Sequence, residues 1–199
     1  MNVEQCPQCG APASPSDRKC AYCKAEFFVT SIAYLSRFDK PAINKYINHY
    51  KQLLRADPDN GELNLAMGIC YLDLGLFDLA AKYCSIALEQ TPDNADAYYY
   101  CAIALLKGRK PKILTLTEIK KIEPLLVAAT QLDNTKAQYF YLHALIKYDF
   151  YLKNGLRLNP PTVEELMAQA SSLHVEKEEI DKLFQRVPVE MPDNKFRLA

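Results

Sequence analysis

Four cysteines near the N-terminus have the spacing of metal ligands. They form two C-x2-C pairs, Cys6 with Cys9 and Cys20 with Cys23, separated by ten residues. A tight turn can bring both thiolates of a pair to about 2.3 Å from one ion, and two such turns complete a tetrahedral cage. No basic segment followed by an apolar run precedes the cysteines, so we expect a cytoplasmic, reducing location in which disulfides would not persist.

The two turns, "CPQCG" and "CAYCK", differ after the second cysteine. Gly10 can take a positive φ at little cost, whereas Lys24 stands where glycine would help. The pattern resembles the short zinc ribbons at the N-termini of many prokaryotic proteins. This resemblance covers about the first 30 residues and implies a structural zinc, with iron in a rubredoxin-like site as the competing possibility. Because four protein ligands leave no open position on the metal, the site should stabilise its segment and not catalyse.

A repeat follows the cysteine segment. "PDN" occurs at 58–60 and again at 92–94, a period of 34 residues. Counted from Gly61, six of eight signature positions resemble the tetratricopeptide repeat. The two departures are Asn64, where a large aromatic is usual, and Cys84, and both suggest a looser repeat. The matching residues are Met67, Gly68, Tyr71, Ala80, Ala87 and Pro92.

Neighbouring segments continue this pattern less perfectly. Residues 40–58 show a helical apolar face, with Asp39 as the N-cap. Pro124 should kink or divide a later helix, and Thr162 with Glu165 forms a capping box. We expect an all-α fold: a TPR-like α-solenoid of antiparallel helix pairs, preceded by a small four-cysteine zinc ribbon. The expected boundaries are a zinc ribbon over 1–30, a linker over 31–39, helical repeats with a C-terminal capping helix over 40–187, and a tail over 188–199.

The resemblance to tetratricopeptide proteins also implies a concave groove, lined by the first helix of each pair, that binds a protein or peptide. The family's groove positions are apolar and aromatic in this sequence. Such a strip should be covered by a partner helix, by the chain's own residues 175–199, or by a second copy in a homodimer. The expected partner-binding residues are Leu65, Ile69, Leu72, Tyr99, Ile103, Leu106, Tyr139, His143 and Ile146.

Charge argues against nucleic acid as the main partner. The net charge is zero, and residues 61–94 contain one basic residue against five acidic ones. The basic stretch "KGRKPK" at 107–112 is expected to be a solvated loop. An adaptor that contacts nucleic acid through the ribbon and this loop is the alternative function, because ribbons do sometimes contact RNA or DNA.

Neither an enzyme nor a membrane protein is indicated. The three histidines are far apart in the sequence, and there is no HExxH motif or glycine-rich phosphate loop. No stretch approaches the roughly 18 consecutive apolar residues of a membrane-spanning helix. We therefore expect a non-catalytic, cytoplasmic scaffold for protein–protein interaction.

Overall fold

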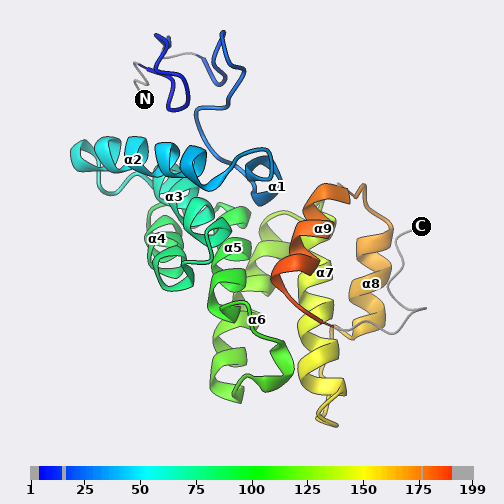
Figure 1. Ribbon diagram of the computed structural model, residues 1–199. Coiled ribbons are helices and arrows are strands. Elements are labelled where there is room, and N and C mark those ends of the chain that lie inside the picture. The colour runs from blue at the N-terminus through cyan, green and yellow to red at the C-terminus, as the bar shows by residue number, and fades with distance from the viewer. Residues whose placement is uncertain (1–4, 15–16, 176, 190–199) are drawn as a thin grey trace. The chain divides into compact units, whose positions relative to one another are not determined.

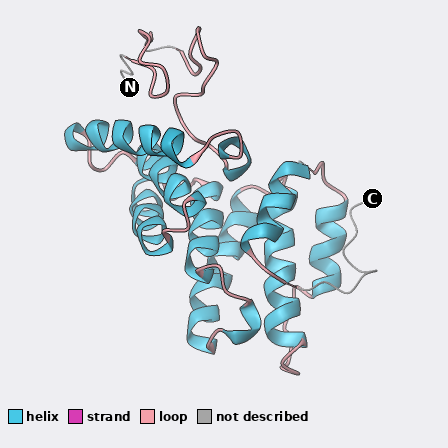
Figure 2. Ribbon diagram, in the orientation of Figure 1, coloured by secondary structure: helices cyan, strands magenta, loops and turns pink. Residues whose placement is uncertain are grey.

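The computed structural model describes residues 5–14, 17–175 and 177–189, and within these ranges the chain is helical, without β-strands (Figure 2). It divides into two compact units, residues 1–91 and 92–199. The first contains α1 (Ile32–Leu35), α2 (Lys40–Ala56), α3 (Gly61–Asp73) and α4 (Phe77–Gln90) (Figure 1). The second contains α5 (Ala95–Leu106), α6 (Leu116–Leu132), α7 (Ala137–Ile146), α8 (Val163–Ser171) and α9 (Lys177–Arg186), with a 3-10 turn η1 (Pro111–Ile113) and a π-helical turn η2 (Lys147–Leu152).

The helices pack in pairs, as the repeat pattern predicts: α3 with α4, α5 with α6, and α7 with α8. The two "PDN" segments begin the first two of these pairs. Asn60 caps α3 by accepting a hydrogen bond from the Leu63 amide, and Asn94 caps α5 by accepting one from the Asp96 amide. An asparagine at the N-cap satisfies an amide that has no partner within the helix. The expected all-α fold of helix pairs is confirmed.

The two departures from the repeat signature do not loosen the α3–α4 pair. Asn64 is buried, and its amide donates to the Pro58 and Asn60 carbonyls at 2.9 and 2.8 Å. It therefore ties α3 to the loop that precedes it. Cys84 is also buried, against Gly68, where a methyl group added to the glycine would lie only 2.5 Å from the sulfur. Cys84 therefore belongs to a close helix–helix contact, whereas Asn64 is held by the preceding loop.

In the first unit, the cysteine module, which we define as residues 5–14 and 17–30, packs on the segment that follows it. The Tyr50 hydroxyl donates to the Phe27 carbonyl at 3.0 Å, and the Tyr46 hydroxyl donates to the Glu26 carbonyl at 2.8 Å. Gln8 donates from its side chain to the Ala42 carbonyl at 2.8 Å. Residues 31–39, expected to be a linker, include α1, all of whose residues are buried and which packs against α3.

The second unit keeps a proline inside a helix. α6 runs from Leu116 to Leu132 through Pro124, so the proline does not divide it. The helix begins with a capping box in which Thr115 and Glu118 bond each other's backbone amides, a start signal that the sequence reasoning missed. The predicted capping box of Thr162 and Glu165 is confirmed at the start of α8.

The predicted capping helix corresponds to α9. Its apolar residues Ile180 and Leu183 are buried together with Glu179, whereas its charged residues Lys177, Glu178 and Asp181 are exposed. The predicted tail lies outside the described residues from 190 onward. Of the helices in the described ranges, none combines the length and apolar character needed to span a bilayer.

Candidate functional site

The four N-terminal cysteines meet at one point. Their sulfur atoms all lie within 4.8 Å of one another. Cys6 Sγ is 3.6 Å from Cys23 Sγ, and Cys9 Sγ is 3.6 Å from Cys20 Sγ. Four sulfurs at about 2.3 Å from a tetrahedral ion would be separated by about 3.8 Å. The arrangement is therefore compatible with a metal ion bound by four thiolates.

Two similar hairpin turns, offset by 14 residues, hold these cysteines. The Cys6 amide donates to the Ala11 carbonyl and the Cys20 amide to the Ala25 carbonyl, both at 2.8 Å. The chain reverses through a positive φ of 72° at Gly10 and of 61° at Lys24. Lys24 thus adopts the left-handed conformation that glycine adopts more readily, as the comparison of the two turns anticipated.

Backbone amides point at the sulfurs. The Gln8 amide donates to Cys6 Sγ at 3.4 Å. Hydrogen bonds from the Cys23 amide and then the Tyr22 amide lower the pKa of Cys20 to about 6, although partial burial opposes them. Burial raises the pKa of Cys6 to about 12 despite similar bonds. Amide donors stabilise the thiolate form, which is the form that binds a metal.

The nine expected groove residues are all buried, and none is more than 8% exposed. Their side chains are therefore covered in this conformation, and their role as partner contacts stays a prediction. Within the second unit, the structure brings Tyr99 and Tyr139 together, with ring centroids 5.0 Å apart, so α5 and α7 meet at these two residues. His143 differs from the other eight because it lies beside a cavity in the second unit.

The C-terminal helix α9 covers part of the groove residues of the second unit. α9 packs against α7, with Ile180, Leu183 and Val187 buried. Burial, together with the negative charges of Glu179 on α9 and Asp96 on α5, raises the pKa of Tyr99 well above its usual value. α9 thus packs on α7, and the charge of its Glu179 lies near enough to Tyr99 of α5 to act on that hydroxyl. We call the surface of α5 and α7 around Tyr99 and Tyr139 the α5–α7 face.

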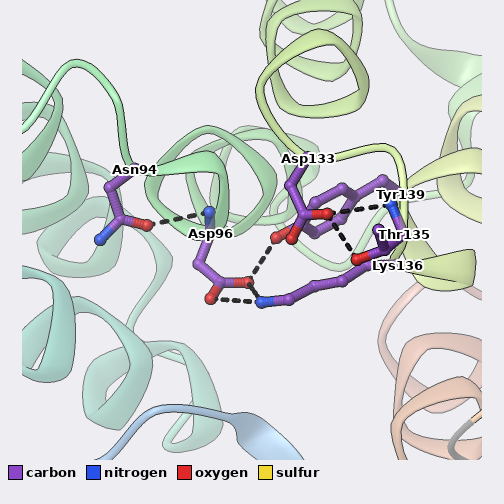
Figure 3. Close-up of polar contacts among 6 residues, drawn as sticks. All are labelled: Asn94, Asp96, Asp133, Thr135, Lys136 and Tyr139. Carbon is purple, nitrogen blue, oxygen red and sulfur yellow. Dashed lines mark hydrogen bonds and ion pairs between the residues drawn. The ribbon is translucent and has the colours of Figure 1, made fainter.

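An ionic cluster fixes the register of α5 and α7 at their N-termini (Figure 3). The Asp96 carboxylate accepts from Lys136 Nζ at 2.8 and 2.7 Å and from the Tyr139 hydroxyl at 2.6 Å. Thr135 donates from its amide and hydroxyl to Asp133 at 2.9 and 2.6 Å, which shapes the turn before α7. Sequence reasoning missed this cluster, because 40 residues separate Asp96 from Lys136 and only the fold brings them together.

The basic stretch 107–112 is a structured connection between α5 and α6. Lys107 caps α5 in a left-handed conformation, and residues 111–113 form η1. Arg109 donates to Glu118 at 2.7 Å, so one cation of the stretch is paired with a carboxylate. The Lys112 amide donates to Asp149 at 2.9 Å.

Comparison with known proteins agrees with this architecture. Residues 47–106 match the family model described as tetratricopeptide repeat. No curated protein matches the chain. Among solved structures, the chain is similar to one titled "Crystal structure of MamA", with a TM-score of 0.54 and 25% sequence identity over 73% of this chain and 76% of that one. The chain therefore has TPR-like helix-pair packing, a fold that in general supports protein–protein interaction.

Proposed function

We propose that this protein is a non-catalytic scaffold that binds an amphipathic helix of a partner protein on the α5–α7 face. The observation that carries the proposal is that an amphipathic helix, α9, already lies there. Its buried apolar residues Ile180 and Leu183, with Val187 just after the helix, follow a helical spacing; Glu179 is buried beside them, and the exposed side includes Lys177, Glu178 and Asp181. A face that accepts this helix has the shape and apolar character to accept a similar one.

The α9 contact is small enough to be exchanged. Fully burying an apolar side chain contributes about 1.5–3 kcal/mol. The segment buries three such side chains, two in α9 and Val187 directly after it, and the entropy lost when the segment is ordered offsets part of this gain. Covalent attachment gives α9 a high effective concentration at the face. A partner helix with larger apolar anchors could therefore displace α9, which would keep the strip covered until the partner arrives.

The first test uses the chain truncated after residue 174. A fluorescently labelled peptide of residues 177–189 should bind it saturably with one-to-one stoichiometry, measured by fluorescence anisotropy. The same peptide carrying Leu183→Glu should bind at least about tenfold more weakly, because a buried charge without a partner is costly. A folded, truncated chain that fails to bind the native peptide would contradict the proposal.

We further propose that Cys6, Cys9, Cys20 and Cys23 hold a structural zinc ion, and that the cysteine module is a second contact surface. Support comes from the sulfur separations and from the small core of the module, built around Phe27. So small a core needs a cross-link or a metal to be stable. Elemental analysis should find about one zinc per chain, and iron or no metal would refute the assignment. Cys9→Ser should release the metal and leave most of the helical circular dichroism intact.

The alternative function, an adaptor that contacts nucleic acid through the ribbon and residues 107–112, has less support because Arg109 is paired with Glu118. The proposed scaffold should not bind RNA or DNA appreciably at physiological salt. Binding that falls steeply with salt and is lost when Arg109, Lys110 and Lys112 become Glu would favour the alternative.

A further inference from the structure

A cavity of about 500 Å³ lies within the second unit, among α6, the α7–η2 helix and residues 159–161. Its volume falls within the range of about 300–1,000 Å³ that is typical of ligand pockets. One part of the lining is apolar and comes from Pro124 and Val127 of α6 and from Pro160 and Pro161. The cavity is separate from the cysteine module and does not depend on the function proposed above.

The other part of the lining is a polar cluster on one helix face. His143, Lys147 and Tyr151 are spaced four residues apart, which places them on one side as α7 passes into η2. Glu123 of α6 meets them: the Tyr151 hydroxyl donates to Oε2 at 2.6 Å, and Lys147 Nζ lies 3.5 Å from Oε1. Burial raises the pKa of Glu123, but its contacts with His143, Tyr151 and Lys147 outweigh burial and hold that pKa below its usual value. Glu123 is therefore a carboxylate at neutral pH.

One buried polar atom in this cluster has no hydrogen-bond partner among the residues that the structure describes. His143 is 2% exposed, and its Nε2 makes no hydrogen bond with any of them. Glu123 Oε1 lies 3.8 Å away, which is too far for a hydrogen bond. An unprotonated Nε2 would repel the carboxylate, so the proton belongs on Nε2, which then acts as a donor without an acceptor. An oxygen atom of a ligand bound in the cavity would accept this hydrogen bond.

The charges that line the cavity favour an anion. The lining contains two positively charged residues, Lys120 and Lys147, and one negatively charged residue, Glu123. Lys147 is itself buried and donates to the Asn159 carbonyl at 2.9 Å, which leaves further protons of its ammonium group for a ligand. One monovalent anion would therefore neutralise the lining.

From these contacts we infer that the cavity binds a carboxylate that carries a short apolar body. The carboxylate accepts from His143 Nε2 and from the ammonium groups of Lys147 and Lys120, and the apolar body packs against Val127 and the prolines. A free branched-chain acid and the C-terminal leucine of a peptide share this chemistry. Binding measurements with both kinds of molecule distinguish the two sources.

The test is a titration of the full chain, followed by amide chemical shifts in NMR. The free acid is 4-methylpentanoate and its neutral control is 4-methylpentanamide; the peptide is Ala-Ala-Leu with a free or an amidated C-terminus. At millimolar concentration, at least one of the two carboxylates should change the amide chemical shifts of residues around the cavity. It should bind about tenfold more tightly than its own amide, because charge-assisted hydrogen bonds are stronger than neutral ones. The carboxylate that binds identifies the source. Absence of shifts with both carboxylates, or equal binding of the amides, would overturn the inference.

Adjacent lysines on α6 provide a matched pair of variants. Lys120 lines the cavity and Lys121 does not, yet both side chains are exposed, so either can be replaced without disturbing the core. Lys120→Ala should weaken binding of the carboxylate several-fold, whereas Lys121→Ala should leave it unchanged. His143→Gln, which keeps a donor, should bind more tightly than His143→Leu, which does not. If Lys120→Ala and Lys121→Ala weakened binding equally, the carboxylate would be responding to the overall charge of the helix and not to a specific site, which would contradict the inference.

Discussion

Replacing Gly68 by alanine tests the close packing of α3 on α4. A Cβ atom at Gly68 would lie 2.5 Å from Cys84 Sγ, 3.3 Å from the Cys84 amide nitrogen and 3.4 Å from the Ala80 carbonyl oxygen. Favourable contacts between carbon atoms lie at about 3.5–4.0 Å. The first contact is therefore severe, and the other two involve backbone atoms that cannot move without shifting α4.

Two opposing effects set the magnitude. Alanine favours the helix over glycine by about 0.8–1.0 kcal/mol, whereas overpacking in a well-packed core costs about 1–3 kcal/mol. Because backbone atoms limit relaxation, we expect the upper part of that cost and a net loss of about 1–2 kcal/mol in the free energy of unfolding. For a chain of this size, such a loss lowers Tm by about 2–8 °C.

The assay is urea unfolding followed by circular dichroism at the helical band. Ser85→Ala on the exposed side of α4 is the control, since it changes helix propensity without a core contact. The double variant Gly68→Ala with Cys84→Ala should be more stable than the sum of the single changes predicts, because removing the sulfur relieves the closest contact. If Gly68→Ala proved as stable as the native chain, or more stable, the reasoning about α3–α4 packing would be refuted.

Three further predictions concern other parts of the molecule. Lys24→Gly should stabilise the cysteine module by about 0.5–1 kcal/mol, because a left-handed residue with a Cβ costs about 1–2 kcal/mol, and the greater backbone entropy of glycine in the unfolded chain offsets part of the gain. Gly10→Ala should destabilise the module, and titration with a chelator measures the stability of both variants. The hydrogen bond from the Thr115 amide, and next the contact with Arg109, lower the pKa of Glu118 to about 2. The stability that this carboxylate contributes is therefore present above pH 4.5 and is lost as the pH falls toward 2. In a plot of urea midpoint against pH, Glu118→Gln should remove this fall. Because α9 covers the α5–α7 face, light scattering should give a mass near the 22.6 kDa of one chain; a mass of about 45 kDa would instead support cover by a second copy in a homodimer and contradict the proposed role of α9.

Local signals in the sequence predicted the parts of the structure that short segments determine. The cysteine spacing predicted the cluster, because each turn brings its own pair together. The 34-residue period and the residues Asp39 and Thr162 predicted helix pairs and helix starts, and both residues act as N-caps in the structure. These features depend on hydrogen bonds and turns within a few residues of one another.

Contacts between distant segments could not be predicted in the same way. The repeat signature alone indicates a weak point at Asn64, but this side chain is satisfied by two carbonyls of the preceding loop. Pro124 breaks a hydrogen-bonding pattern, yet α6 continues through it, held by a capping box at its start and by its contacts with α5 and α7. The polar cluster around His143 depends on where α6 meets η2, and no spacing along the chain reveals that position.

The central claim is that the α5–α7 face receives an amphipathic helix and that α9 occupies it. The most direct measurement compares two variants of the full chain, Leu183→Glu at a buried position of α9 and Gln185→Glu at an exposed one. Each variant is titrated with the labelled native peptide of residues 177–189. The buried substitution should release α9 and let the peptide bind, while the exposed substitution should leave the face occupied and binding as weak as in the native chain. Equal behaviour of the two variants, with both folded, would contradict the claim.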